Sequence, residues 1–238
     1  AAAVACTENY FIAVVADAAE FVCAGQPISG ANEQGVRLAS YWANTCVAAI
    51  LANHAYRCKR ALVDVLRQQQ KTLKQHYLHD VASYGVLILD TTSRELNWWF
   101  TGDCRLGIET DAGSLHWLGV PHRVENAALL KDRYQSESEL TSADERIAAR
   151  HTLTRSLKAR RFTPPEKIQT HISATDIIKI ATDGYWCEHL TDGIPLQQLD
   201  DDASLLTIKP GECVLAQTTD IPNFASLTNS EPHLQGRV

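Results

Sequence analysis

The chain has 238 residues, of which 45% are hydrophobic and 21% are charged. This composition is that of an ordinary globular protein, and it excludes the disordered and fibrous classes. A formal net charge of −6 argues against a surface built mainly for nucleic acid. No apolar run reaches about 18 residues, so we expect no membrane-spanning segment.

The first part of the chain is predicted to form one strand followed by two helices. Residues 10–16 (YFIAVVA) are apolar and rich in β-branched and aromatic types, as in a buried strand, and they end at Asp17. Apolar residues then recur at helical spacing over residues 32–52 and again over residues 59–78. We expect the polar face of the second helix, which includes residues 67–71, to be solvated.

The rest of the chain is predicted to alternate between strands and short helices. We expect strands over residues 84–90, 95–101, 105–110, 167–172, 176–182 and 205–208. We expect helices over residues 127–131, 142–149 and 183–190, and an irregular tail from residue 218. No repeat or linker divides the chain, so the pattern favours a single α+β layered domain over residues 1–238.

Seven cysteines are scattered along the chain without a CxxC pair. An odd number without close spacing indicates reduced thiols rather than a disulfide framework. Because thiols stay reduced in the cytosol, we expect a cytoplasmic protein.

Four aspartates lie at the ends of predicted strands, namely Asp17, Asp103, Asp183 and Asp201. A carboxylate at the end of an apolar strand is costly unless a cation or hydrogen bonds compensate for its burial. If the four converge, their oxygens would suit Mg²⁺ or Mn²⁺ rather than Zn²⁺. A single such aspartate is more often a turn former, and spacing alone does not show that the four meet.

Three of these aspartates belong to the short motifs TDGYW (residues 182–186), TGDCR (residues 101–105) and DDAS (residues 201–204). The motifs resemble those of the PP2C-type, metal-dependent protein serine/threonine phosphatases, because TDGYW is similar to the family's S/T-D-G-x-W element and TGDCR to its G-D-S-R turn. Residues 201–204 (DDAS) resemble its closing D-[ND]-x-[ST] motif, and residues 14–17 (VVAD) its V-A-D motif. A helix start of the form G…A-S is matched by Gly35, Ala39 and Ser40. These elements follow the family order over residues 8–208.

The resemblance implies a four-layer α-β-β-α sandwich, in which two antiparallel sheets are flanked by helices and hold metal ions at one end. It implies that Asp17 and Asp183 are catalytic and that Asp17 bridges two Mn²⁺ or Mg²⁺ ions. Asp183, Asp201 and the carbonyl of Ala18 would complete the metal sites. Asp103 would hold a third, weaker ion together with Asp183. In the family a metal-activated water attacks phosphorus, so no protein nucleophile is needed.

The chain also departs from the family pattern. The family reads D-G-x-G-G where residues 17–21 are DAAEF, and an alanine fits there only if the backbone does not need a positive φ. No arginine precedes Arg37, so the family's phosphate-binding arginine has no counterpart. Residues 83–85 (SYG) and 121–122 (PH) replace the family's G-[ST]-T and D-H.

A basic cluster follows the middle of the chain, formed by Arg155, Lys158, Arg160 and Arg161. The three arginines could bind a phosphorylated substrate in place of the missing arginine, and a solvated face is the alternative. Cys104, which replaces the motif serine, is either a reactive thiol or a small substitute for serine.

Three hypotheses follow. The first is a cytoplasmic Mn²⁺- or Mg²⁺-dependent phosphatase that acts on phosphoserine and phosphothreonine in proteins and opposes a serine/threonine kinase, like the compact bacterial branch of the family. The second is a pseudophosphatase that keeps the fold as a phosphoprotein-binding or regulatory module. The third is an unrelated metal-dependent hydrolase that shares only the acidic strand ends.

Overall fold

The strand expected from the apolar run near the N-terminus lies at the centre of a seven-stranded sheet. The structure is a computed structural model that describes residues 1–19, 22–23, 26–27, 31–126, 149–199, 201–210 and 223–228. The strand order of this large sheet is β10-β6-β5-β2-β1-β13, with β9 paired to β5. Its strands are β1 (Ala2–Cys6), β2 (Tyr10–Ala18), β5 (Val81–Asp90), β6 (Glu95–Thr101), β9 (Leu157–Lys158), β10 (Glu166–His171) and β13 (Phe224–Thr228).

A second sheet of four antiparallel strands has the order β12-β11-β7-β8. Its strands are β7 (Arg105–Glu109), β8 (Leu115–Leu118), β11 (Ile177–Ala181) and β12 (Leu205–Ile208). A separate pair is formed by β3 (Val22–Cys23) and β4 (Gln26–Pro27). The meander expected in the middle of the chain is therefore divided: β5 and β6 belong to the large sheet, and β7 turns into the small one.

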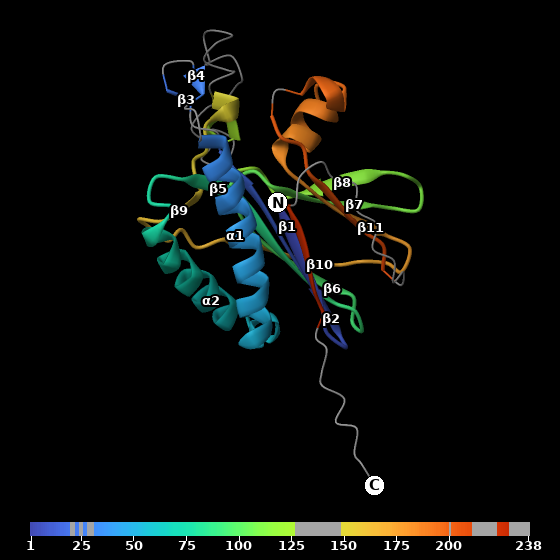
Figure 1. Cartoon of the computed structure of the whole chain (residues 1–238). Coiled ribbons are helices and arrows are strands. Elements are labelled where there is room, and N and C mark those ends of the chain that lie inside the picture. Colours follow the sequence, from blue (N-terminus) through green and yellow to red (C-terminus); the bar gives the residue numbers. More distant parts are fainter. Residues whose placement is uncertain are drawn as a thin grey trace.

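Two long helices, α1 (Ala31–Ala52) and α2 (Lys59–Thr72), pack side by side against the large sheet (Figure 1). Short helical turns are η1 (Ala55–Arg57), η2 (Leu73–Gln75), η4 (Gly184–His189) and η5 (Leu196–Gln198), of which η4 is a π-helix. No helix in the described ranges is both long and apolar enough to cross a membrane. The helices expected over residues 127–131 and 142–149 lie outside the described residues, apart from residue 149.

Side chains of the central strands alternate between two hydrophobic cores, one between the large sheet and the helices and one between the two sheets. On β2, Ile12 and Val14 face the helices, whereas Val15 faces the small sheet. The neighbouring tryptophans of β6 divide in the same way, because Trp99 joins the helix-side core and Trp98 the core between the sheets. The expected layering of two sheets flanked by helices is thus confirmed.

Three expectations are corrected by the structure. The large sheet is mixed rather than purely antiparallel, because β1 and β13 pair in parallel. The tail from residue 218 was expected to be irregular, yet residues 224–228 form β13. Gln70 lies on the helix face expected to be solvated, but it is 4% exposed because its amide donates to the carbonyls of Lys158 and Ala159 at 2.7 and 2.6 Å.

Candidate metal centre

Three of the four predicted aspartates converge at one end of the two sheets. Asp17, Asp183 and Asp201 each offer an oxygen, and these three atoms lie within 4.8 Å of one another. Asp17 is near the end of β2 and alternates with Ala16, so it faces the small sheet. Asp183 follows β11, and Asp201 precedes the antiparallel neighbour β12. We call Asp17, Asp183 and Asp201 the aspartate triad.

Backbone and hydroxyl hydrogen bonds join the two segments that supply the second and third aspartates. The amide of Thr182 donates to the carbonyl of Ser204 at 3.1 Å, and the amide of Ser204 donates to the Thr182 hydroxyl at 2.8 Å. A Cβ on Gly184 would lie 2.6 Å from the carbonyl oxygen of Asp202. The glycine after Asp183 therefore permits the close approach that brings the triad together.

The electrostatics of the triad are those of an oxygen site that attracts cations. Burial raises the pKa of Asp17 well above its usual range, and the nearby charges of Asp183 and Asp201 raise that pKa further. Burial, followed by repulsion from Asp183, raises the pKa of Asp201 to about 7. A divalent cation would offset both the cost of burying these carboxylates and their mutual repulsion. Carboxylate oxygens are also the ligands that Mg²⁺ and Mn²⁺ prefer. The residues present therefore fit such ions.

The backbone at Ala18 tolerates the replacement of the family's glycine. Only His54 and Arg94 have a positive φ among the non-glycine residues that the structure describes, so Ala18 is in an ordinary conformation. Successive residues of a strand point their backbone groups toward opposite neighbouring strands, so residues two apart point toward the same neighbour. The amide of Ala16 donates to Ala1 on the β1 side, so the carbonyl of Ala18 points toward the same side, beyond the end of β1.

The fourth aspartate, Asp103, lies beside the triad but outside the group of mutually close oxygens. Its Oδ1 accepts from the Ser83 hydroxyl at 2.6 Å, and its Oδ2 accepts from Nε of Arg123 at 2.9 Å. Nη2 of Arg123 donates to Oδ2 of Asp183 at 2.8 Å, so one guanidinium joins both carboxylates. Burial and the charge of Asp183 raise the pKa of Asp103, and Arg123 opposes that rise. Gly102 has a φ of 99°, and a Cβ there would lie 2.1 Å from the Ser83 Oγ.

Arg123 is the residue of this site that sequence reasoning missed. It follows the PH dipeptide that replaces the family's D-H, and its side chain is only 1% exposed. A fully buried arginine must be paired, but its two hydrogen-bonded carboxylates come from other segments, and only the longer contact to Glu125, at 3.9 Å, is local. The only sequence signal was an arginine next to a position that departs from the family pattern.

The structure does not bring the basic cluster onto the triad. Arg155 is half-buried and contacts Nε2 of His122 at 3.3 Å and the carboxylate of Glu166 at 3.7 Å. Arg160 and Arg161 are exposed, and neither forms an ion pair with the triad within the described part of the chain.

The two other candidates near the site have structural partners. His122 is buried, accepts from the amide of Gly102 through Nδ1 at 3.0 Å, and faces Glu166 through Nε2 at 3.2 Å. Cys104 is 1% exposed, and burial followed by the charge of Asp17 raises the pKa of its thiol well above the usual range. Burial and the raised pKa both disfavour the thiolate in the metal-free protein, which favours the interpretation of Cys104 as a small substitute for serine.

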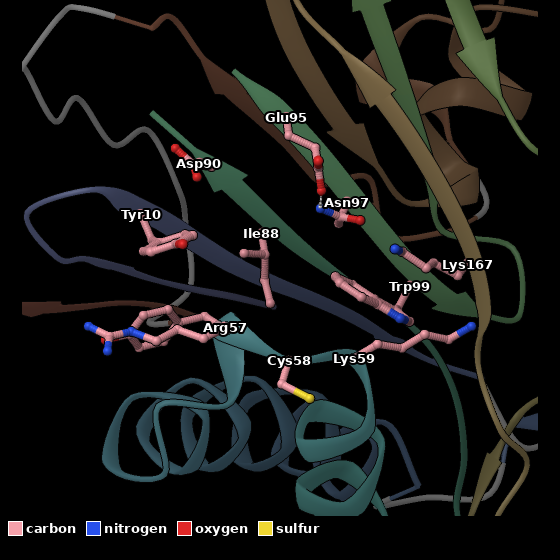
Figure 2. A pocket seen from close by; sticks show the side chains of 11 residues that line it. Tyr10, Arg57, Cys58, Lys59, Ile88, Asp90, Glu95, Asn97, Trp99 and Lys167 are labelled. Atoms are coloured by element: carbon pink, nitrogen blue, oxygen red, sulfur yellow. Dashed lines mark hydrogen bonds between the residues drawn. The ribbon is translucent and has the colours of Figure 1, made fainter. Parts of the chain in front are cut away.

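A pocket of about 250 Å³ lies at the other end of β2 from Asp17 (Figure 2). Strand residues such as Tyr10 and Trp99 line one side, and residues 57–59 line the other. Lys167 lies over the ring of Trp99 at 5.2 Å. None of the four aspartates lines this pocket, so it is separate from the candidate metal centre.

Known proteins similar to this chain are found among solved structures. No family model matches the chain, and no curated protein matches it. The serine/threonine phosphatase Stp1 from Staphylococcus aureus superposes with a TM-score of 0.57 at 13% identity, over 77% of this chain and 69% of that one. The catalytic domain of the phosphatase PstP, solved with two manganese ions, has a TM-score of 0.56 at 13% identity, over 87% and 89%.

A stage II sporulation E family protein from Thermanaerovibrio acidaminovorans gives a TM-score of 0.54 at 17% identity, over 77% and 80%. The PPM serine/threonine phosphatase MsPP from Mycobacterium smegmatis superposes with a TM-score of 0.51 at 16% identity, over 77% of this chain and 71% of that one. Identities this low establish a shared architecture and nothing finer. The chain therefore has the fold of the PP2C, or PPM-type, serine/threonine phosphatases.

Proposed function

We propose that this chain is a metal-dependent phosphoprotein phosphatase that hydrolyses phosphoserine and phosphothreonine. The observation that carries the proposal is the convergence of Asp17, Asp183 and Asp201 within 4.8 Å on a fold shared with serine/threonine phosphatases. One of those structures holds two manganese ions, and the donor set here suits the same kind of ion. We place residues 1–238 in one phosphatase domain of a cytoplasmic protein that opposes a serine/threonine kinase.

Each residue of the triad has a distinct task in this proposal. Asp17, Asp183 and Asp201 would hold the Mn²⁺ or Mg²⁺ ions together with the Ala18 carbonyl, and by the family resemblance Asp17 would be the ligand shared between two ions. When bound, the ions neutralise charge on the phosphoryl group and lower the pKa of a water molecule that attacks phosphorus. The protein's own contribution is to hold these oxygens in place before the substrate arrives.

The proposed substrate contacts, Arg155, Arg160 and Arg161, form no ion pair with the triad within the described residues. Arg160 and Arg161 are exposed, and Arg155 is half-buried next to Glu166, so this segment could attract a phosphorylated protein through charge. Such contacts would act on binding rather than on the chemical step, because they lie outside the metal centre.

Hydrolysis of a phosphothreonine peptide tests the proposal. With Mn²⁺ the protein should release phosphate, and a chelator should stop the reaction. Asp183→Asn should lower kcat by about 10²-fold or more, because it removes a charged ligand with little change in shape. Asp111→Asn, in the exposed turn before β8, is the matched control and should retain full activity. A protein that binds phosphoprotein but shows no metal-dependent turnover would be a pseudophosphatase and would contradict the proposal.

A further inference from the structure

An arginine side chain is built into the acidic site. Arg123 is 1% exposed, and its guanidinium donates to Asp103 at 2.9 Å, to Asp183 at 2.8 Å and to the sulfur of Cys187 at 3.3 Å. Its flat face lies over the ring of Trp186, 4.8 Å from the ring centre. The guanidinium is therefore fixed both along its edge and on its face.

The aromatic wall behind the guanidinium is itself fixed. Nε1 of Trp186 donates to the backbone carbonyl of Asp103 at 2.9 Å, so the ring cannot turn without losing a buried hydrogen bond. An arginine that binds a substrate phosphate needs exposed N–H groups, whereas this side chain is almost inaccessible. Arg123 therefore acts on the carboxylates and not on the substrate.

The same contacts occupy both oxygens of Asp103. Oδ1 accepts from the Ser83 hydroxyl at 2.6 Å, and Oδ2 accepts from Arg123. Two neighbouring carboxylates without a cation would repel each other and attract a divalent ion. Between Asp103 and Asp183 that cation is already present as a guanidinium.

We propose that Arg123 is a built-in cation that takes the place of a divalent ion between Asp103 and Asp183. It limits the site to the ions held by the aspartate triad, and it orients Asp183 toward them. Asp103 then serves as the anchor of Arg123 and is not a metal ligand. The inference rests on the proposed function, because it assumes that the triad holds divalent ions.

Calorimetric titration of the full chain with Mn²⁺ alone tests this role, because it counts ions without requiring turnover. The wild type should bind two ions. Arg123→Gln removes the charge and frees Asp103 and Asp183, so this variant should bind a third, weaker ion. In the double variant Arg123→Gln with Asp103→Asn, the count should return to two.

Two further variants separate charge from packing. Arg105 also lies over Trp186 at 4.8 Å, but its side chain donates to the Gly119 carbonyl at 3.3 Å. Arg105→Gln should therefore leave the count at two. Asp103→Asn on its own should also leave two ions, each bound within about tenfold of the wild-type affinity, because it removes no ligand of the triad.

The possible results distinguish the inference from the proposed function. A wild type that binds no Mn²⁺ would overturn the proposed function. A wild type and an Arg123→Gln variant that both bind two ions would overturn only the role of Arg123. If Arg123→Gln does not fold, Asp103→Asn decides: two ions support the built-in cation, and a loss of one ion shows that Asp103 is a metal ligand.

Discussion

The candidate site holds four aspartate carboxylates and one guanidinium, that of Arg123. Together with burial, this excess of negative charge determines the pKa values of Asp17 and Asp201 and their attraction for cations. Asp17, Asp183 and Asp201 lie within 4.8 Å of one another, whereas Arg123 neutralises the charge between Asp183 and Asp103. Arg123 pairs with Asp183 but forms no ion pair with Asp17 or Asp201 in the described part of the chain, and burial together with the neighbouring carboxylates raises the pKa values of these two groups. The metal-free protein should therefore bind protons at Asp17 and Asp201 more readily than the unfolded chain does.

This preference predicts how the stability of the metal-free protein depends on pH. The pKa of Asp201 is about 7 in the folded protein and about 4 in the unfolded chain, so between these values the folded state binds more protons. Stability must then fall as the pH rises through this window. We expect the Tm of the metal-free protein to fall by about 2–8 °C between pH 5.5 and pH 7.5. Thermal unfolding followed by circular dichroism at several pH values measures this.

Two controls identify the group responsible for the pH dependence. Asp201→Asn should weaken the dependence, because an amide does not titrate and only the contribution of Asp17 remains, whereas Asp111→Asn should leave it unchanged. Saturating Mn²⁺ should also flatten the curve, since the ion replaces the protons. A metal-free wild type that is equally stable at both pH values would contradict the shifted pKa of Asp201.

At the level of single residues, the sequence was sufficient to predict the aspartate triad but not the role of Arg123 beside it. Asp17, Asp183 and Asp201 could be identified because each is attached to the end of a predicted strand and fits a family motif. Apart from Glu125 at 3.9 Å, the charged partners of Arg123 belong to segments that are 20 and 60 residues away in the chain. Burial of a charged side chain depends on such partners, and periodicity does not report them.

The elements that were predicted are those with a clear hydrophobic period. Helix α1 and strands β2, β5 and β6 carry long apolar patterns and appear within a few residues of their expected bounds. Strands β1, β8, β9 and β13 were not predicted, and each has at most five residues. Short strands of this kind are stabilised by their neighbours, so their own sequence contains little signal.

One contact between elements joins the helical layer to the edge of the large sheet. Gln70 on α2 donates to the carbonyls of Lys158 and Ala159 at β9. Gln70→Ala should lower the free energy of unfolding by about 1–3 kcal/mol, because it leaves two carbonyls without their donor. Gln68→Ala, an exposed glutamine on the same helix, should change it by less than about 0.5 kcal/mol. Urea unfolding measures both, and equal effects would show that the buried amide adds nothing.

At the scale of the whole molecule, the stacking of two sheets creates the candidate site. The large sheet supplies Asp17, and the turn between β6 and β7 supplies Asp103. In the small sheet, Asp183 follows the end of β11 and Asp201 precedes the start of β12. The order of family motifs predicted the two stacked sheets, and the phosphatase structures that superpose on this chain share that architecture. The parallel pairing of β13 with β1 was not predictable, because it joins opposite ends of the described chain.

The central claim is that Asp17, Asp183 and Asp201 together hold two divalent cations. Crystals grown with Mn²⁺ and measured at the manganese absorption edge test it most directly, because anomalous scattering locates the ions without reference to activity. We predict two peaks about 3.5–4 Å apart, with Asp17 oxygens bound to both at about 2.0–2.6 Å. An anomalous map without a peak at these three carboxylates, from crystals saturated with Mn²⁺, would contradict the account.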